Sequence, residues 1–530
     1  MNAGNQPNGA PKPWPIAKTV MLSVFMEVLD TSVANVALPH IAGNLSATVE
    51  ESTWVLTSYL VSNAIVLPLT GWFSTLFGRK RFYMVCVLLF TASSLLCGLA
   101  PSLPWLVFFR ILQGAGGGAM VPIAQAILME SFPRAKQGMA MAVFGMGVVV
   151  APIIGPTLGG WITDSYTWRW IFFINIPVGV ASLLLTSLLI SDPPYLVRRN
   201  LRGLRIDYIG LGLLSVGLGF LQVMLDKGQT DDWFGSNFII GCAVLACVGI
   251  VGALIWELRS RDPVVDLRML KDRNLFLGTL TMFMLGFVLY GSTVLLPILL
   301  QTLMGYTALL SGLVLSPGGL VVLCMMPLVG VLISRFQARW LAIFGLSVTG
   351  LSLFQMSHFS LQLDFRTAVL ARMVQGVGMA FLFVPINTAA FSFIPREKMN
   401  NATGLINLAR NIGGSVGIAN VTTMLARRAQ LHQAVLVGSL TPLDYGVRAM
   451  IGGASHLLHA AGSAGAQATA QALGLLYGEL LRQAAMLSFV DTFWVMGVVC
   501  LVMIPVMFLA KESKRGETAV AAEIPTILAE

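Results

Sequence analysis

Two carboxylic acids lie in the middle of the first long apolar run of this 530-residue chain. Glu27 and Asp30 belong to a run from Ala17 to Pro39, which is about as long as the ~20 residues with which a helix crosses a bilayer. Their spacing of three puts both on one helical face. Ionisable groups at such depth usually face a protein interior or a water-filled path. Burial disfavours a charged carboxylate, so the pair is suited to proton exchange; a carboxylate held at a boundary by a neighbouring helix is the alternative.

A permanently charged guanidinium lies in another apolar run, at Arg110. This group cannot shed its proton and needs a partner, for which the sequence offers Asp30 or Glu27 across the helical bundle. A nearby cation favours a charged carboxylate and burial opposes it, so a change in the contact with Arg110 would change the proton affinity. We therefore expect proton coupling at Asp30, Glu27 and Arg110, against the alternative of a static structural pair.

The composition is that of an integral membrane protein. Hydrophobic residues make up 56% of the chain and charged residues only 11%. The six cysteines lie in apolar runs without metal-site or disulfide spacing, and His456 and His459 lack a third ligand. No cofactor or metal is therefore expected. The first residues carry no signal-peptide pattern, so the first span is expected to remain in the mature protein.

Apolar runs recur along the chain and predict an all-α membrane protein with fourteen transmembrane helices. Of the 33 Lys and Arg residues, one alternating set of connecting segments carries 23, the opposite set carries seven, and three lie inside apolar runs. Basic residues concentrate on the cytoplasmic side of membrane proteins. The sequence thus predicts that both termini are cytoplasmic.

The chain also repeats itself. Residues 110–114, Arg-Ile-Leu-Gln-Gly, return as Arg-Met-Val-Gln-Gly at 372–376. Such a repeat predicts two pseudo-symmetric six-helix bundles with the substrate between them near the midplane. Two extra helices, roughly 206–224 and 238–256, lie between the repeats. The expected division is a cytoplasmic tail at 1–15, a six-helix bundle at 16–190, a linker with the extra helices at 191–274, a second bundle at 275–510 and a cytoplasmic tail at 511–530.

The last segment between spans, residues 425–489, is too polar to cross a membrane as a whole. It is rich in Ala, Gln and Leu, and few helix breakers follow Gly465. The alternation of charge places it outside, in the periplasm. We expect one or two amphipathic helices there.

Several motifs resemble those of the fourteen-span drug:proton antiporters of the major facilitator superfamily. Within that family the chain is most similar to EmrB/QacA-type multidrug exporters, above all to the EmrB-type subunit of tripartite efflux pumps. The motifs are Leu-Asp-Thr-Ser-Val-Ala-Asn-Val-Ala-Leu-Pro at 29–39, Gly-Trp at 71–72, the Arg110 motif at 110–114, Ala-Pro-Ile-Ile-Gly-Pro-Thr-Leu-Gly-Gly at 151–160 and Trp-Ile-Phe-Phe-Ile-Asn-Ile-Pro at 170–177.

The resemblance implies that the fifth span carries the antiporter motif at the interface between the two halves. Glycines four apart permit close helix approach, and proline bends a helix. On this basis Gly155 and Gly159 are expected to pack against the other half. The hinge or gate residues expected from the motif are Gly147, Pro152, Gly155, Pro156, Gly159 and Gly160.

The family's cytoplasmic loop motif is present but altered. Its expected residues are Gly71, Gly78, Arg79 and Lys80, while Thr75 stands where the family has an acid that takes part in a charge-relay latch. The sequence therefore leaves that latch in doubt. Glu27 is a second departure, since many relatives have a neutral residue there, and it could be an extra proton site or a carboxylate that recognises cations.

The predicted function is proton-driven export of lipophilic compounds from a bacterial inner membrane. An apolar central cavity rich in Met and Phe is expected, with polar candidates at Asn35, Gln113, Gln125, Arg372, Gln375, Asn387 and Arg410. For Arg372 and Arg410 a structural role is favoured over binding of an anionic substrate group. No nucleotide-binding Gly-x-x-x-x-Gly-Lys run is present, so the proton motive force is the expected energy source.

The resemblance also implies partners: a periplasmic EmrA-type membrane-fusion adaptor and a TolC-type outer-membrane channel, with the 425–489 segment as the docking site. The alternatives are a proton-coupled exporter of one metabolite, siderophore or fatty acid and, less favoured, an intramembrane enzyme or a receptor. An enzyme would need a nucleophile with a base, or a metal cluster, and neither pattern is visible in the spans.

Overall fold

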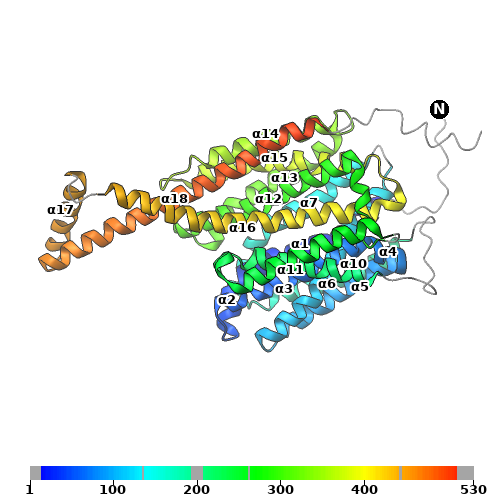
Figure 1. Ribbon diagram of the computed structural model, residues 1–530, viewed down its shortest axis with the longest axis horizontal. Helices are drawn as coiled ribbons and strands as arrows, with labels where there is room; N and C mark the ends of the chain where they lie inside the picture. Colours follow the sequence, from blue (N-terminus) through cyan, green and yellow to red (C-terminus); the bar gives the residue numbers. More distant parts are fainter. Residues whose placement is uncertain (1–12, 134–135, 193–206, 261–262, 441–444, 510–530) are drawn as a thin grey trace, which may run out of the picture.

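The regular structure consists of helices throughout the part of the chain that the computed structural model describes, residues 13–133, 136–192, 207–260, 263–440 and 445–509. The expected tail at 511–530 and most of the tail at 1–15 lie outside these residues. Figure 1 shows long helices that run roughly alongside one another.

The N-terminal helices form one packed set, in which α1 contacts α6, α7 and α9, α3 contacts α6, and α5 contacts α6 and α9. Their bounds are α1 Pro13–Asn44, α2 Val49–Ser52, α3 Trp54–Val66, η1 Leu67–Leu69, α4 Thr70–Phe77, α5 Arg79–Gly98, α6 Leu103–Ser131, α7 Gln137–Ser165, α8 Trp170–Phe173 and α9 Asn175–Leu189.

The C-terminal helices form a second packed set, in which α12 contacts α15 and α16, α14 contacts α15, and α18 contacts α14 and α16. Their bounds are α12 Arg273–Thr302, α13 Ala308–Leu332, α14 Ala338–Met356, α15 Phe365–Phe391, η5 Arg396–Lys398, α16 Met399–Ser439, α17 Tyr445–Ala460 and α18 Gly465–Phe508.

Two further helices lie between the sets in sequence, α10 Tyr208–Lys227 and α11 Asn237–Arg259, with the short η3 Trp233–Gly235 before α11 and η4 Leu267–Lys271 after it. They pack against each other, and α10 also contacts α3 and α16. Among the described residues, 12 helical segments are long and apolar enough to cross a membrane. The protein is therefore a multi-pass membrane protein, as its composition predicted.

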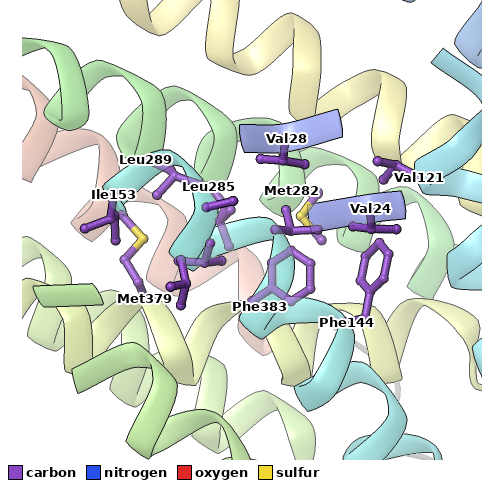
Figure 2. Close-up of a cluster of buried hydrophobic side chains, with 14 of the residues drawn as sticks. Val24, Val28, Val121, Phe144, Ile153, Met282, Leu285, Leu289, Met379 and Phe383 are labelled. Carbon is purple, nitrogen blue, oxygen red and sulfur yellow. The ribbon is translucent and has the colours of Figure 1, made fainter. Parts of the chain in front are cut away.

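The two sets meet through an apolar cluster in the centre of the molecule (Figure 2). The cluster takes Val24 and Val28 from α1 and Phe144 from α7, and faces residues of α12 and α15 such as Leu285 and Phe383. The Phe144 and Phe383 rings are 5.9 Å apart between centroids. The contacts within this cluster are between side chains, so its two surfaces can separate without breaking backbone hydrogen bonds.

One face of α7 packs against α1, and this corrects the expectation that Gly155 and Gly159 pack against the other half. A Cβ atom at Gly155 would overlap Ser32, and one at Gly159 would lie 3.1 Å from the Val33 Cα atom, both in α1 of the same set. The opposite face of α7 reaches the other set, where Gly145 lies against Phe383. Glycine spacing predicts a close approach but not the partner, because either face of a helix can supply it.

Proline and serine cooperate at this contact. Pro156 has no N–H group, so the carbonyl of Pro152, one turn earlier, loses its helical donor. The Ser32 hydroxyl donates to that carbonyl at 3.0 Å. The α1–α7 contact thus supplies a hydrogen bond that α7 cannot make by itself.

The outer ends of α16 and α18 extend far beyond the other helices. They contain 41 and 44 residues, respectively, and at about 1.5 Å per residue each is roughly 60 Å long, twice the ~30 Å of a bilayer core. With α17 between them they form a helical protrusion (Figure 1). The described residues of the 425–489 segment are therefore mostly helical, as predicted, but many of them continue the two flanking helices rather than forming separate ones.

The α1–α7 contact yields a test with an adjacent control. Gly159→Leu should lower the thermal unfolding midpoint of the detergent-solubilised protein, because overpacking a tight contact costs about 1–3 kcal/mol. Gly160→Leu is the control, since the nearest atom to a Cβ there is Val36 Cγ1 at 3.9 Å. Equal midpoints for the two variants would contradict this packing.

Candidate functional site

A buried ion pair joins α1 to α6. Arg110 Nη1 donates to Asp30 Oδ2 at 2.5 Å, and both side chains are almost completely buried, with 0% and 1% exposure. The other carboxylate oxygen of Asp30 accepts from Gln113 Nε2 at 3.0 Å and from Asn175 Nδ2 at 2.8 Å. The carboxylate thus receives one charged donor and two neutral ones, which is the satisfaction that a buried charge requires.

The guanidinium of Arg110 is held on several sides. Its Nε donates to the Val55 carbonyl at 3.0 Å, and its Nη1 also contacts Gln113 Oε1 at 2.8 Å. The carbon at its centre lies 4.3 Å from the centroid of the Tyr59 ring, a cation–π geometry. Four helices, α1, α3, α6 and α9, therefore converge on one pair of opposite charges.

Glu27 forms a second centre one helical turn away, also buried. Its Oε1 accepts from the Tyr59 hydroxyl at 3.1 Å and from Asn63 Nδ2 at 3.0 Å. Tyr59 links the two centres, because its ring faces Arg110 while its hydroxyl binds Glu27. A Cβ atom at Gly117 would lie 2.7 Å from that hydroxyl and 3.3 Å from Glu27 Cγ, so glycine leaves the space in which the two meet.

Glu27 also faces the second set of helices. Its hydrogen-bond partner Asn63 accepts from Asn411 Nδ2 of α16 at 3.3 Å. Arg410, the neighbour of Asn411, is buried and interacts electrostatically with Glu27 without forming an ion pair with it within the described residues. Tyr290 of α12 interacts electrostatically with both Glu27 and Arg410. A carboxylate of one set and a guanidinium of the other are thus close enough to interact electrostatically.

A buried amide chain joins the sets at a different level. Gln125 Nε2 of α6 donates to Asn387 Oδ1 of α15 at 2.6 Å, and Asn407 Nδ2 of α16 donates to Gln125 Oε1 at 2.5 Å. Gln125 and Asn387 are 262 residues apart, the period of the sequence repeat. Equivalent positions of the two repeats therefore meet side chain to side chain.

The repeat of the Arg110 motif forms a third centre. Arg372 of α15 donates to the hydroxyls of Ser292 and Thr293 of α12, each at 3.2 Å, and to Gln375. Ser292 lies 262 residues after Asp30, as Arg372 does after Arg110. The carboxylate of the first centre is thus replaced by a hydroxyl in the third.

In the altered loop motif, the basic residue Arg79 pairs with an acid that lies outside the motif. Arg79, at the start of α5, pairs with Glu130 near the end of α6 through two contacts of 2.5 and 2.9 Å. The backbone N–H of Lys80 donates to Asp192 at 2.7 Å. At Gly71 a Cβ atom would overlap Asn401 of α16. A charged contact therefore exists at this motif, although Thr75 cannot provide its acid.

The seven polar cavity candidates do not converge on one place. Gln113 belongs to the Asp30 centre, Gln125 and Asn387 to the amide chain, Arg372 and Gln375 to the third centre, and Arg410 faces Glu27. Asn35 is exposed. Sequence reasoning assigned no role to Tyr59, Asn63, Asn175, Asn407 and Glu130. The signal available for them was a polar residue inside an apolar run, which marks burial without naming a partner.

The ion pair makes a prediction about stability. Arg110→Ala leaves a buried carboxylate without its cation and should destabilise the protein by about 3–5 kcal/mol. The double variant Asp30→Asn with Arg110→Gln removes both charges and should recover most of that loss. Thermal unfolding of the purified variants tests this, and a double variant no more stable than Arg110→Ala would argue against the pairing.

Comparison with known proteins places this geometry in a family. Residues 20–418 match the family model described as the Major Facilitator Superfamily. The chain is 37% identical over 491 residues to the multidrug export protein EmrB of Escherichia coli strain K12, covering 92% of this chain and 94% of that one. It is 38% identical over 506 residues to the fatty acid resistance protein FarB of Neisseria gonorrhoeae, covering 95% and 97%.

Solved structures support the same fold at low sequence identity. The proton:xylose symporter XylE, a major facilitator superfamily protein, superimposes with a TM-score of 0.57 at 14% identity, covering 94% of this chain and 96% of that one. The human organic anion transporter MFSD10 gives a TM-score of 0.59 at 13% identity, covering 94% and 100%. The chain belongs to the major facilitator superfamily, a family of membrane transporters rather than enzymes, and matches its EmrB-type multidrug exporters.

Proposed function

We propose that this protein is a proton-coupled antiporter that exports lipophilic and amphipathic compounds across the bacterial inner membrane. The observation that carries the proposal is the Asp30–Arg110 pair with Glu27 beside it. Two buried carboxylates and one fixed cation form a centre in which a change in protonation must alter helix contacts. In this scheme the proton motive force is the energy source.

The proposal includes fourteen spans in two six-helix bundles related by a pseudo-two-fold axis, with α10 and α11 inserted between them. Besides the 12 apolar segments, α14 and α16 contain 19 and 41 residues and pack alongside spanning helices. Their polar residues lower their apolarity, and on α16 Asn407, Arg410 and Asn411 contact or face other helices rather than lipid. The charge alternation supports cytoplasmic termini.

Proton entry changes the Asp30 centre in a definite way. A protonated Asp30 no longer balances Arg110, and the guanidinium then gains from moving toward another acceptor. A protonated Glu27 likewise gives up its attraction to Arg410 in the other set. Both steps weaken contacts that fix α1 to its neighbours. Proton uptake from outside thereby favours a different arrangement of the two sets, and release to the cytoplasm restores the first.

The amide chain suits a gate between the sets. Gln125, Asn387 and Asn407 are buried and hydrogen-bonded in this conformer. If the halves separate at that end, water replaces these hydrogen bonds at small net cost. The apolar cluster beside them separates through side chains alone (Figure 2). Alternating access would then need no backbone rearrangement at the contact.

The apolar cluster between the two sets suits the binding of substrates with varied shapes. The cluster between the sets is rich in Val, Leu, Met and Phe, and methionine adapts to varied apolar shapes. A second candidate function is export of one amphipathic acid. The name of the Neisseria relative, a fatty acid resistance protein, favours that candidate and keeps it beside multidrug export.

A partner at the protrusion would make this the pump of a tripartite system with an EmrA-type adaptor and a TolC-type channel. The exposed residues of α17 and of the outer part of α18 include large apolar side chains: Tyr445, Met450, Leu457, Leu473, Leu475 and Tyr477. Exposed apolar groups that project beyond the membrane mark protein–protein contact sites. The projecting shape supports this docking site (Figure 1).

Asp30→Asn tests proton coupling. The amide keeps the shape of the side chain but cannot exchange a proton, so the variant should insert normally and lose uphill dye efflux. The assay is efflux in everted vesicles with and without an imposed pH gradient. Asp164→Asn is the control, since that side chain is 72% exposed at the end of α7. Proton-driven efflux by Asp30→Asn at the wild-type rate would end the assignment.

Deletion of residues 437–474, bridged by a short Gly/Ser linker, tests the docking site. The variant should retain dye transport in vesicles, because the cut removes α17 and the outer ends of α16 and α18 but spares the packed sets. It should lose drug resistance in whole cells and co-purification with the adaptor. Adaptor that still co-purifies would place the docking surface elsewhere.

A further inference from the structure

Arg372 is a buried cation that lacks the carboxylate its counterpart has. In the first repeat Asp30 neutralises Arg110, whereas in the second the equivalent position is Ser292. Arg372 is 3% exposed, and within the described residues no carboxylate forms an ion pair with it. Hydroxyl groups solvate a guanidinium without neutralising it, so a net positive charge remains in the interior.

The neighbouring glutamine has the complementary defect. In the first repeat Gln113 accepts from the arginine through Oε1 and donates through Nε2 to Asp30 Oδ1. In the second repeat Gln375 also accepts from Arg372, but its buried Nε2 has no hydrogen-bond partner within the described residues. The unused donor is the one that would contact a carboxylate oxygen. A buried donor without an acceptor is destabilising, and a bound carboxylate would remove that cost.

We propose that Arg372 and Gln375 form an anion-binding site that receives the carboxylate of an amphipathic substrate, with the hydroxyls of Ser292 and Thr293 holding the guanidinium in place. The first repeat indicates the geometry, with one carboxylate oxygen on the guanidinium and the other on the glutamine amide. A planar carboxylate matches the fork of donors that arginine presents. The site deepens the proposed export function by assigning it a substrate class.

The position of the site suits an amphiphile. Thr293 is half-buried and lies three residues after Tyr290 on α12, so both point to the same side of the helix. Tyr290 interacts with Glu27 and Arg410, which places that side toward the centre between the sets. Leu289, which belongs to the apolar cluster in Figure 2, lies three residues before Ser292 on α12, about one helical turn away. A head group at Arg372 would thus leave its apolar chain against the cluster.

A pair of ligands with the same chain and opposite head groups tests the site. Binding of dodecanoate and of dodecyltrimethylammonium would be measured at pH 8 by calorimetry, using the full-length protein in zwitterionic nanodiscs. Arg372→Gln should weaken dodecanoate binding about tenfold or more, the scale of a lost charged hydrogen bond. The ratio of the two dissociation constants is the readout, because a general loss of structure would weaken both ligands together.

Ser292→Asp makes the sharper variant. The new carboxylate would pair with Arg372 as Asp30 pairs with Arg110, and should compete with dodecanoate and weaken it about tenfold. Ser292→Asn is the matched variant of equal size without charge, and should weaken dodecanoate less than Ser292→Asp does, so the difference between the two ratios isolates the effect of the charge. Equal ratios for the Asp and Asn variants, or an unchanged ratio in Arg372→Gln, would overturn the anion site.

Failure of the site and failure of the export function give different results. If a cationic dye is exported in a proton-driven manner but the Arg372 variants do not change dodecanoate binding, the export function is supported and the anion site is contradicted. If dodecanoate binding depends on Arg372 but the protein shows no proton-driven efflux, the anion site is supported and the export function is contradicted. Arg372→Lys adds a check on geometry: it keeps the charge but loses the fork, and should bind dodecanoate more weakly than wild type.

Discussion

The buried pair of Asp30 and Arg110 constrains the rest of the structure. A guanidinium that cannot lose its charge must be neutralised and hydrogen-bonded inside the protein. That requirement draws Val55 of α3, Gln113 of α6 and Asn175 of α9 around the pair. Four N-terminal helices, α1, α3, α6 and α9, are therefore organised about one electrostatic centre.

The two repeats place the same arginine and glutamine at equivalent positions, but only the first repeat places an acid beside the arginine. The first contains a closed ion pair, and the second retains the arginine and glutamine but has hydroxyls in place of the acid. Charge is thus balanced internally in one set of helices and left open in the other. In the proposed mechanism, one half responds to protons and the other to the head group of a ligand, with an adaptable apolar surface between them (Figure 2).

The sequence predicted the features of single helices better than it predicted which helices contact each other. The apolar runs, the repeat and the candidate partner of Arg110 were visible in the sequence, and the ion pair with Asp30 is present. The glycines of α7 were correctly expected to make a close contact, but it is with α1 and not with the other half. An acid was missing from the loop motif, yet Glu130, some 50 residues away, contacts Arg79.

The sequence by itself determined that this chain crosses a membrane many times, carries costly charges inside its spans and belongs with transporters. The first two properties follow from composition and local spacing, which do not depend on how helices are arranged, and the third follows from the resemblance of the motifs to a known family. Only the tertiary structure decided that Tyr59 links Glu27 to Arg110, that Gln125 meets Asn387, and that Gln375 retains an unused donor. The physical reason is that a hydrogen bond between helices depends on their relative position and rotation, which apolar packing over the whole molecule sets.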